Sequence, residues 1–171
     1  MNKVIKIYWG FLISLIEKYT PLTLTGHRIE DIFNYYQLSS TLSTSGQPTA
    51  IQFRAIRDAG FKTIINLLPE NTENALAHEA DLVKELGMAY IHIPVHFLRP
   101  TEEDFRRFTT AMQTVSHEKT WVHCAANARA SAFIYRYRTA ILGEDPDIAK
   151  WDVREIWEPY LTWRKFISWN G

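Results

Sequence analysis

The sequence predicts a three-layer α/β domain, in which a mainly parallel central sheet is flanked by helices. Short segments rich in β-branched and aromatic residues alternate with segments of helical periodicity from about residue 31 onward, and this alternation is typical of layered α/β folds. The length of 171 residues suits one domain, and an apolar share of 46% is sufficient for a core. We therefore divide the chain into an N-terminal apolar helical extension, residues 1–30, and a folded domain, residues 31–171.

Four short segments are expected to form the strands, because β-branched and aromatic residues fit a pleated, partly buried surface. These segments are residues 36–42, 62–68, 90–95 and 120–123. Helices are expected over residues 48–58 and 76–86, where apolar residues recur at helical spacing. Gly60 and Gly87 supply the C-terminal signals of these two helices.

Further helices are expected in the second half of the chain. Thr101 followed by three acidic residues predicts an N-cap and the first turn of one helix. After the last strand, a helix ends at Gly143, a second begins near Pro146, and Pro159 separates it from a third. The expected helices therefore extend the α/β pattern through the last third of the sequence.

Residues 4–16 form the most apolar stretch, but thirteen residues with Lys6 among them fall short of the roughly 20 that span a bilayer. Lys3 and Lys6 before an apolar run are similar to a signal peptide, which would imply secretion, yet no small-residue cleavage site follows. We expect an amphipathic helix that packs on the domain. The alternative is a weak peripheral membrane contact through Trp9 and Phe11.

The charges of the chain balance, with 19 Lys and Arg against 19 Asp and Glu. No overall positive field attracts nucleic acid, so no nucleic-acid partner is expected. Cys124 is the only cysteine, which excludes an intramolecular disulfide and favours a reducing, cytoplasmic compartment. One thiol cannot form a cysteine-rich zinc site and the histidines lack metal-ligand spacing, so we expect no metal and no other cofactor.

The most informative segment is WVHCAANARAS, residues 121–131, where an apolar strand runs into a loop of small residues and then a helix. Such a loop points several backbone N–H groups into one concavity, and the helix dipole adds partial positive charge there. A phosphate fits this concavity, and the same field stabilises a thiolate at Cys124. The residues expected to line the phosphate site are Ala125, Ala126, Asn127, Ala128 and Arg129.

Arg129 lies five positions after Cys124, at the start of the expected helix, and can curl back over the loop. Its planar guanidinium can bind two equatorial oxygens of a phosphoryl group and hold the charge that spreads over them in the transition state. The segment therefore predicts a cysteine nucleophile with an arginine that binds an anion.

His123, Cys124, Arg129 and Ser131 resemble the signature of cysteine-dependent protein phosphatases, HCxxGxxR followed by Ser or Thr, in the dual-specificity branch. The segments SGQP, IINLLP, IPV and WEP are also similar to a bacterial group of dual-specificity-like phosphatases; they lie at residues 45–48, 64–69, 93–95 and 157–159. The resemblance covers about residues 31–168. It implies a phosphoric monoester hydrolase that acts on phosphorylated proteins or small phosphoesters.

The resemblance also implies a role for each residue of the motif. Cys124 would attack phosphorus and become a phosphocysteine, while Arg129 would bind the phosphoryl oxygens. His123 would orient the loop and promote ionisation of the thiol, and Ser131 would assist breakdown of the intermediate.

The sequence departs from the signature in three ways. Four residues separate Cys124 from Arg129 where the usual motif has five, and this shorter loop resembles that of an atypical bacterial group. Asn127 stands at the usual glycine, and Asn is one of the few residues that enter positive φ at modest cost. Ser131 follows Arg129 by two positions rather than one. We therefore expect a tighter loop that still makes its turn at Asn127.

The general acid follows less directly from the sequence. In the resembled family an Asp protonates the leaving oxygen from the loop after the third strand, but here that loop reads HFLRPTEED. We expect His96 to take this role, because it stands near that place and an imidazole titrates near neutral pH. Asp104, in the first turn of the next helix, is the alternative.

Two other functions compete with phosphate ester hydrolysis. Rhodanese-like sulfurtransferases also place a cysteine at the head of a short loop, often with this four-residue interval to an arginine, and carry a persulfide. A non-catalytic phosphate-binding pseudophosphatase is the third reading, because the loop lacks the Asp acid. His123 and the SGQP and IPV segments favour the phosphatase.

Overall fold

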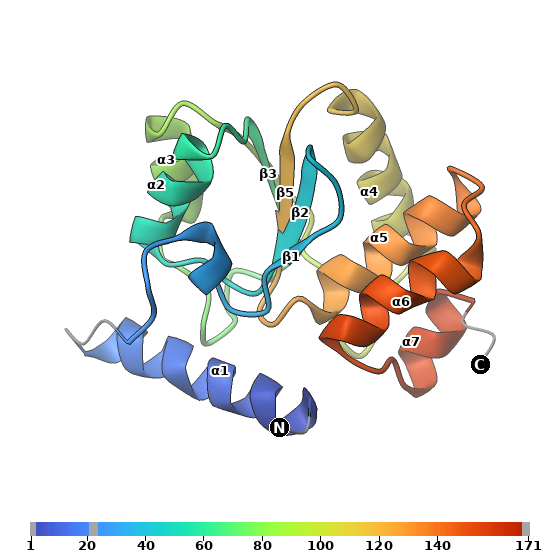
Figure 1. The fold of residues 1–171 in the computed structure, drawn as a ribbon, viewed down its shortest axis with the longest axis horizontal. Coiled ribbons are helices and arrows are strands. Elements are labelled where there is room, and N and C mark those ends of the chain that lie inside the picture. Colours follow the sequence, from blue (N-terminus) through green and yellow to red (C-terminus); the bar gives the residue numbers. More distant parts are fainter. Residues whose placement is uncertain (1–2, 21–23, 169–171) are drawn as a thin grey trace.

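The computed structural model of the chain describes residues 3–20 and 24–168. Five strands form one sheet in the order β1-β2-β5-β3-β4, in which β1 pairs antiparallel with β2 and the other pairs are parallel. The helices α2 and α3 lie on one face of the sheet, while α4 and α5 lie on the other (Figure 1). The expected three-layer α/β fold with a mainly parallel sheet is confirmed.

The helices and strands follow one another along the chain in this order: α1 Lys3–Tyr19, the 3-10 helix η1 Ile29–Asp31, β1 Tyr36–Gln37, β2 Leu42–Ser45, α2 Ala50–Asp58, β3 Thr63–Asn66, α3 Glu79–Glu85, β4 Ala89–His92, α4 Glu102–Thr114, β5 Thr120–His123, α5 Ala128–Ala140, α6 Pro146–Ile156 and α7 Leu161–Phe166.

Three parallel strands end at the same level of the sheet. Ser45 at the end of β2 and Asn66 at the end of β3 are both in register with His123, the last residue of β5. The loops that leave these strands therefore meet at the carboxyl edge of the sheet, where open α/β sheets form their ligand sites.

The sheet separates two apolar cores. Trp121 packs edge-on against Phe61, 4.9 Å between ring centroids, in the core beneath α2 and α3. Val122 and Cys124 belong to the larger core beneath α4 and α5. Because successive side chains of a strand point to opposite faces, His123 lies on the α2 side, with its ring 5.8 Å from that of Phe53.

The expected strand over residues 36–42 is wrong, because a turn divides it into β1 and β2. The backbone N–H groups of Leu38 and Ser39 both donate to the carbonyl of Leu42, and Thr41 donates its N–H to Ser39 Oγ. Serine and threonine side chains that bond nearby backbone in this way favour turns over strands. The result is a short hairpin that gives the sheet its one antiparallel pair.

The helix expected over residues 76–86 begins three residues late, at Glu79. His78 adopts the left-handed conformation, with φ of 57°, and an L-residue there cannot continue a right-handed helix. This late start places Glu79 in the first turn, where its side chain is buried.

Helix α1 lies along one end of the domain (Figure 1). The carboxylate of Glu17 accepts hydrogen bonds from the backbone N–H groups of Leu24 and Thr25, at 2.7 and 2.6 Å. Gly10 approaches Phe33 so closely that an added Cβ would lie 1.9 Å from its ring. The contact of Gly10 with Phe33 packs the helix on the domain, while Glu17 binds the segment that follows the helix within residues 1–30.

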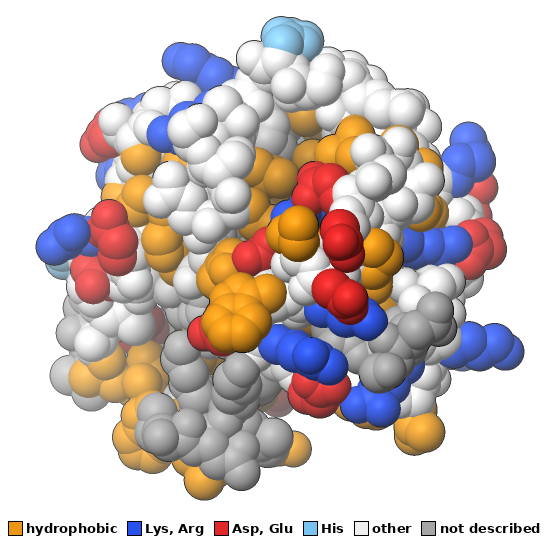
Figure 2. Space-filling model, turned by 45° about the vertical axis from the view of Figure 1, so that its right-hand side comes forward, with side chains coloured by type: hydrophobic (Ala, Val, Ile, Leu, Met, Phe, Trp, Pro, Cys, Tyr) orange, Lys and Arg blue, Asp and Glu red, His pale blue; other side chains and the backbone are white. Residues whose placement is uncertain are grey.

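One face of α1 is left exposed. Its side chains Ile5, Tyr8, Trp9 and Leu12 recur at helical spacing and are each between 46% and 72% exposed. Among the described residues, no helix is both long and apolar enough to cross a bilayer. Elsewhere, the face of the molecule in Figure 2 mixes acidic and basic side chains without a large patch of one sign.

Candidate active site

The loop between β5 and α5 is built around Asn127, the N-cap of α5. Its φ is 68°, in the left-handed region, as the sequence predicted for the residue at the usual glycine. The Asn127 side chain donates from Nδ2 to the carbonyl of Asn34 at 2.7 Å and to Oγ1 of Thr44 at 2.9 Å. These two bonds tie the turn to β2 and to the segment before β1.

Two backbone carbonyls of the loop accept hydrogen bonds from residues outside it. The carbonyl of Ala126 accepts a hydrogen bond from Asn34 Nδ2 at 3.0 Å. The carbonyl of Ala125 accepts from the Gln47 N–H at 3.2 Å and from Asn74 Nδ2 at 3.3 Å. Since these carbonyls are turned towards the surrounding protein and the first N–H groups of α5 have no partner within their helix, the inner side of the loop is suited to an anion.

Cys124 stands at the head of the loop, directly after β5. Its backbone N–H donates to the carbonyl of Ser45 at 3.3 Å, and its side chain is 1% exposed. The thiol is free. The sheet therefore fixes the backbone of the predicted nucleophile through the end of β2.

Arg129, in the first turn of α5, is a buried cation without a carboxylate partner. Its side chain is 7% exposed, its Nε lacks a hydrogen-bond partner, and no ion pair with it occurs among residues 3–20 and 24–168. The guanidinium carbon lies 5.3 Å from the centroid of the Phe97 ring. Because a buried charge is costly unless it is paired, this arrangement is suited to an anionic ligand.

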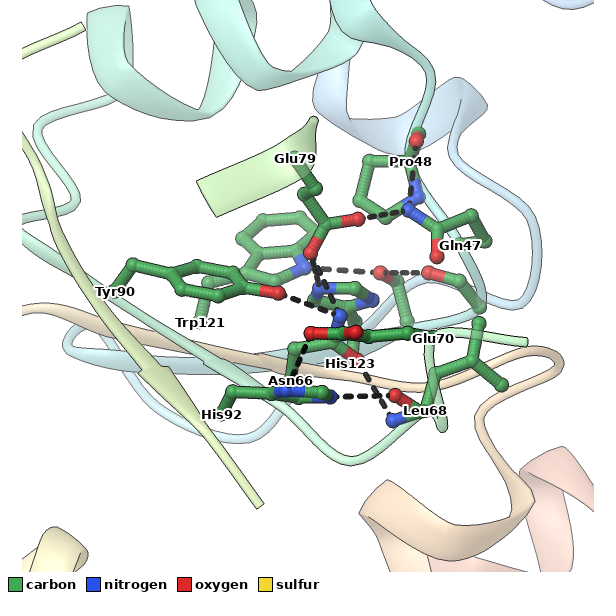
Figure 3. A network of polar contacts seen from close by, with 12 residues as sticks. Gln47, Pro48, Asn66, Leu68, Glu70, Glu79, Tyr90, His92, Trp121 and His123 are labelled. Atoms are coloured by element: carbon green, nitrogen blue, oxygen red, sulfur yellow. Dashed lines mark hydrogen bonds and ion pairs between the residues drawn. The ribbon is translucent and has the colours of Figure 1, made fainter. Parts of the chain in front are cut away.

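His123 is held by a buried polar network on the opposite side of the sheet (Figure 3). Its Nε2 lies 2.9 Å from Oε1 of Glu79, which also accepts from Asn66 Nδ2 at 2.8 Å. The other oxygen of Glu79 accepts from Gln47 Nε2 at 2.5 Å. Burial alone would raise the pKa of Glu79, but the neighbouring charge of His123 and the hydrogen bonds from His123 and Gln47 hold the pKa below its usual value.

Ser131 is buried one turn into α5. Its hydroxyl donates to the carbonyl of Asn127 at 2.7 Å and accepts from Trp157 Nε1 at 3.1 Å. The Ser131 hydroxyl therefore links the N-cap of α5 to the residue that directly follows α6. The role in breakdown of an intermediate stays a prediction.

The two candidate acids lie in different surroundings. His96 is exposed, and its Nδ1 accepts the N–H of Leu98 at 3.3 Å. Asp104 forms a capping box with Thr101: its Oδ2 accepts the Thr101 N–H at 2.9 Å, and Thr101 Oγ1 accepts the Asp104 N–H at 3.1 Å. The choice of His96 stays a prediction, while the capping box accounts for Asp104 without a catalytic role.

Several site residues escaped the sequence analysis. Glu79, Asn34 and Asn74 come from segments far from the motif along the chain and meet it only through the fold. Gln47 was visible as part of the SGQP segment, but its bond to Glu79 was not. No cluster of three or more His, Cys, Asp or Glu side chains that could hold a metal occurs in the described part of the chain.

Comparisons with known proteins agree with this geometry. A family model described as "PTP-NADK: DSP-PTPase phosphatase fused to NAD+ Kinase" matches residues 14–155. A crystal structure of a putative phosphatase (DUF442) from Shewanella putrefaciens is 34% identical, with a TM-score of 0.75 over 82% of this chain and 92% of that one. TpbA of P. aeruginosa, crystallised in complex with pTyr, is 18% identical over 71% of this chain and 72% of that one, with a TM-score of 0.59, which shows the fold alone.

Two curated relatives match a shorter stretch. A "Beta-lactamase hydrolase-like protein" of Xylella fastidiosa is 32% identical over 96 residues, which cover 54% of this chain and 22% of the relative. The protein of the same description from Agrobacterium fabrum is 31% identical over 97 residues, 55% of this chain and 22% of the relative. The match therefore spans about a fifth of the length of these relatives.

The structure predicts that Asn127 stabilises the loop both by its hydrogen bonds and by its tolerance of positive φ. Asn127→Ala loses the two Nδ2 bonds and adds strain, so we expect the free energy of unfolding to fall by about 2–4 kcal/mol. Asn127→Gly loses the same bonds without the strain and should be about 1–2 kcal/mol more stable than the alanine variant. Urea denaturation measures both; equal stability of the two variants would show that the backbone conformation is not what Asn127 supplies.

Proposed function

Since this chain belongs to the family of DSP-PTPase phosphatases fused to NAD+ kinase, matched over residues 14–155, we propose that it hydrolyses phosphoric monoesters through a phosphocysteine at Cys124. The observation that carries the proposal is Arg129, a buried guanidinium without a carboxylate partner, in the first turn of the helix that follows the loop. A phosphoryl group supplies the two oxygens that such a planar donor binds.

The reaction proceeds in two displacements. The Cys124 thiolate attacks phosphorus, a P–S bond forms, and the P–O bond to the leaving group breaks as that oxygen takes a proton from His96. Water then attacks phosphorus and gives a proton back to His96 while the P–S bond breaks, which releases inorganic phosphate and restores both the thiolate and the protonated His96. Loop N–H groups and Arg129 hold the equatorial oxygens through both transition states.

The substrates proposed are phosphorylated proteins or small phosphoesters. TpbA, which shares the fold, was crystallised with pTyr, and this favours an aryl phosphate as the first substrate to assay. The single cysteine supports the further proposal that the protein works in a reducing, cytoplasmic compartment.

Sulfur transfer is the second candidate function, and the length of the loop favours it. Only four residues separate Cys124 from Arg129, an interval that rhodanese-like enzymes also use. In this alternative the Cys124 thiolate takes the outer sulfur of thiosulfate, releases sulfite, and passes that sulfur to cyanide as thiocyanate. A pseudophosphatase would bind oxyanions and perform neither reaction.

The nucleophile and the anion-binding arginine give the first kinetic prediction. Cys124→Ser should abolish turnover of an aryl phosphate while vanadate or phosphate still binds, because the loop N–H groups and Arg129 remain. Arg129→Lys keeps the charge and loses the planar pair of donors, so the rate should fall at least about 100-fold. The exposed Arg54 provides the matched control, Arg54→Lys, which should be unaffected.

Steady-state assays of aryl phosphate hydrolysis and of thiosulfate:cyanide sulfur transfer, run on the same preparation, separate the three candidates. Phosphatase activity retained by Cys124→Ser or by Arg129→Lys would refute the proposed mechanism. Sulfur transfer without ester hydrolysis would establish the second candidate instead.

The proposed acid gives a second kinetic prediction. With a poor leaving group His96→Ala should slow the first chemical step by about 100-fold or more, since the departing oxygen then leaves without a proton. With an activated aryl leaving group the loss should be small.

Asp104→Asn is the opposing variant. It should cost about 0.3–1 kcal/mol of stability and should change the rate little, because the carboxylate stabilises the first turn of α4. The ratio of rates for poor and good leaving groups decides: a change in Asp104→Asn alone would identify Asp104 as the acid.

We also propose that the exposed face of α1 contacts the surface of an anionic membrane. Trp9 and Tyr8 suit the lipid headgroup region, and residues 3–18 contain three lysines against one glutamate. The intact protein should therefore sediment with anionic vesicles at low salt and do so less with Trp9→Ser. Ile148→Ser, which changes an equally exposed apolar residue on α6, should sediment as the wild type does. Wild-type protein that stays in the supernatant would contradict the proposal.

A further inference from the structure

The buried carboxylate of Glu79 takes no part in the two displacements described above. It is 4% exposed and accepts hydrogen bonds from three side chains, those of Gln47, Asn66 and His123 (Figure 3). These partners come from the loop before α2, from the end of β3 and from the end of β5. Glu79 therefore connects the three chain segments that converge on the catalytic loop from the α2 side of the sheet.

The donors around Glu79 fix its ionisation. A carboxylate surrounded by N–H donors is stable only when it is ionised, because the ionised group accepts hydrogen bonds and does not donate them. This agrees with the pKa of Glu79, which burial alone would raise but which His123 and the hydrogen bonds hold below its usual value. It follows that His123 Nε2 carries a proton and donates it to Oε1, 2.9 Å away.

The negative charge of Glu79 needs a compensating positive charge, because an unpaired buried ion costs much free energy. In the described part of the chain, the one ion pair formed by Glu79 is with His123. The buried Nδ1 of His123 has no hydrogen-bond partner, so no donor forces that nitrogen to stay unprotonated. Both nitrogens can therefore carry protons.

The other groups around the pair do not provide the charge. Tyr90 on β4 remains a neutral phenol, because burial first, and then the charge of Glu79, raise its pKa above the usual value. Helix α2 contributes Phe53, which contacts the His123 ring and has no charge. His92, which lies towards the edge of the sheet, is 3.6 Å from the exposed carboxylate of Glu70.

From this geometry we propose that Glu79 is a positioning residue that holds His123, the residue before the nucleophile, as an imidazolium. His123 directly precedes Cys124 in the chain, and the two side chains lie on opposite faces of the sheet. The positive end of the Glu79–His123 pair therefore acts on the thiol across the end of β5, where it favours ionisation. The pair also fastens the end of β5 to the first turn of α3. This inference rests on the proposed function in assigning the nucleophile to Cys124.

The protonation state of His123 is the direct test. Imidazole ¹⁵N shifts of the wild-type protein at pH 8, where an unperturbed histidine is neutral, should identify His123 as an imidazolium. Glu79→Gln keeps the shape of the side chain and removes its charge, so His123 should then be neutral at pH 8. A neutral His123 in the wild type would overturn the proposal, and that measurement needs no variant to fold.

The second readout is alkylation of Cys124 by iodoacetamide as a function of pH. In Glu79→Gln, the rate below the midpoint should fall by about tenfold, which corresponds to a shift of one pH unit, while the plateau at high pH is unchanged. Glu79→Asp keeps a carboxylate and should show a smaller shift than Glu79→Gln. Glu85→Gln, an exposed change on the same helix, should leave the alkylation profile as in the wild type. A lower plateau without a shift would mean that Glu79 has only a structural role.

The kinetic readout separates this inference from the proposed function. The acid limb of the kcat/KM profile for an aryl phosphate should move to higher pH in Glu79→Gln with its plateau preserved. If the wild type hydrolyses no phosphoester and the two other readouts are as expected, the proposed function fails and the role of Glu79 stands. If the wild type is active and Glu79→Gln shifts none of the three, the role of Glu79 fails alone.

Discussion

The charge on Arg129 is the constraint around which the loop between β5 and α5 is arranged. A guanidinium that is 7% exposed and unpaired is unfavourable in a protein that binds no anion, since a buried charge is stable only with a partner. The loop compensates in part, because its carbonyls are bonded away from the arginine by Asn34, Gln47 and Asn74. An oxyanion that enters the loop pairs with Arg129, and the relief of this unpaired charge then contributes to the free energy of binding.

The parallel sheet brings the residues of the site to one edge and places their side chains on both of its faces. Because β2, β3 and β5 end at one level, the residues after them share one edge. Alternation along β5 then places Cys124 in the core beneath α4 and α5 and His123 against α2. Cys124, the proposed nucleophile, and His123 are thus adjacent in sequence but are supported by different layers of the fold.

The fold and the motif were accessible from the sequence because both are local patterns. The strand at residues 120–123 and the positive φ of Asn127 follow from residue types within one segment. The hairpin that divides residues 36–42 was missed because serine and threonine bonds to the backbone override the strand pattern. The late start of α3 was missed because a left-handed histidine carries no distinctive sequence signal.

What the sequence could not show is the long-range part of the site. Glu79 reaches His123 across 44 residues, and Asn34 reaches Asn127 across 93. Such contacts depend on strand order and register, which a single sequence does not specify. An acidic residue at the start of a helix ordinarily serves the helix dipole, so nothing local distinguished Glu79 from Glu102.

A crystal structure of the protein with vanadate or tungstate bound tests the anion-binding role of Arg129 and the loop most directly. We expect one oxyanion within the loop, with backbone N–H groups of residues 125–129 at hydrogen-bond distance and two nitrogens of Arg129 on two of its oxygens. An oxyanion bound elsewhere, with the Arg129 guanidinium still against Phe97 and the loop N–H groups unoccupied, would contradict it.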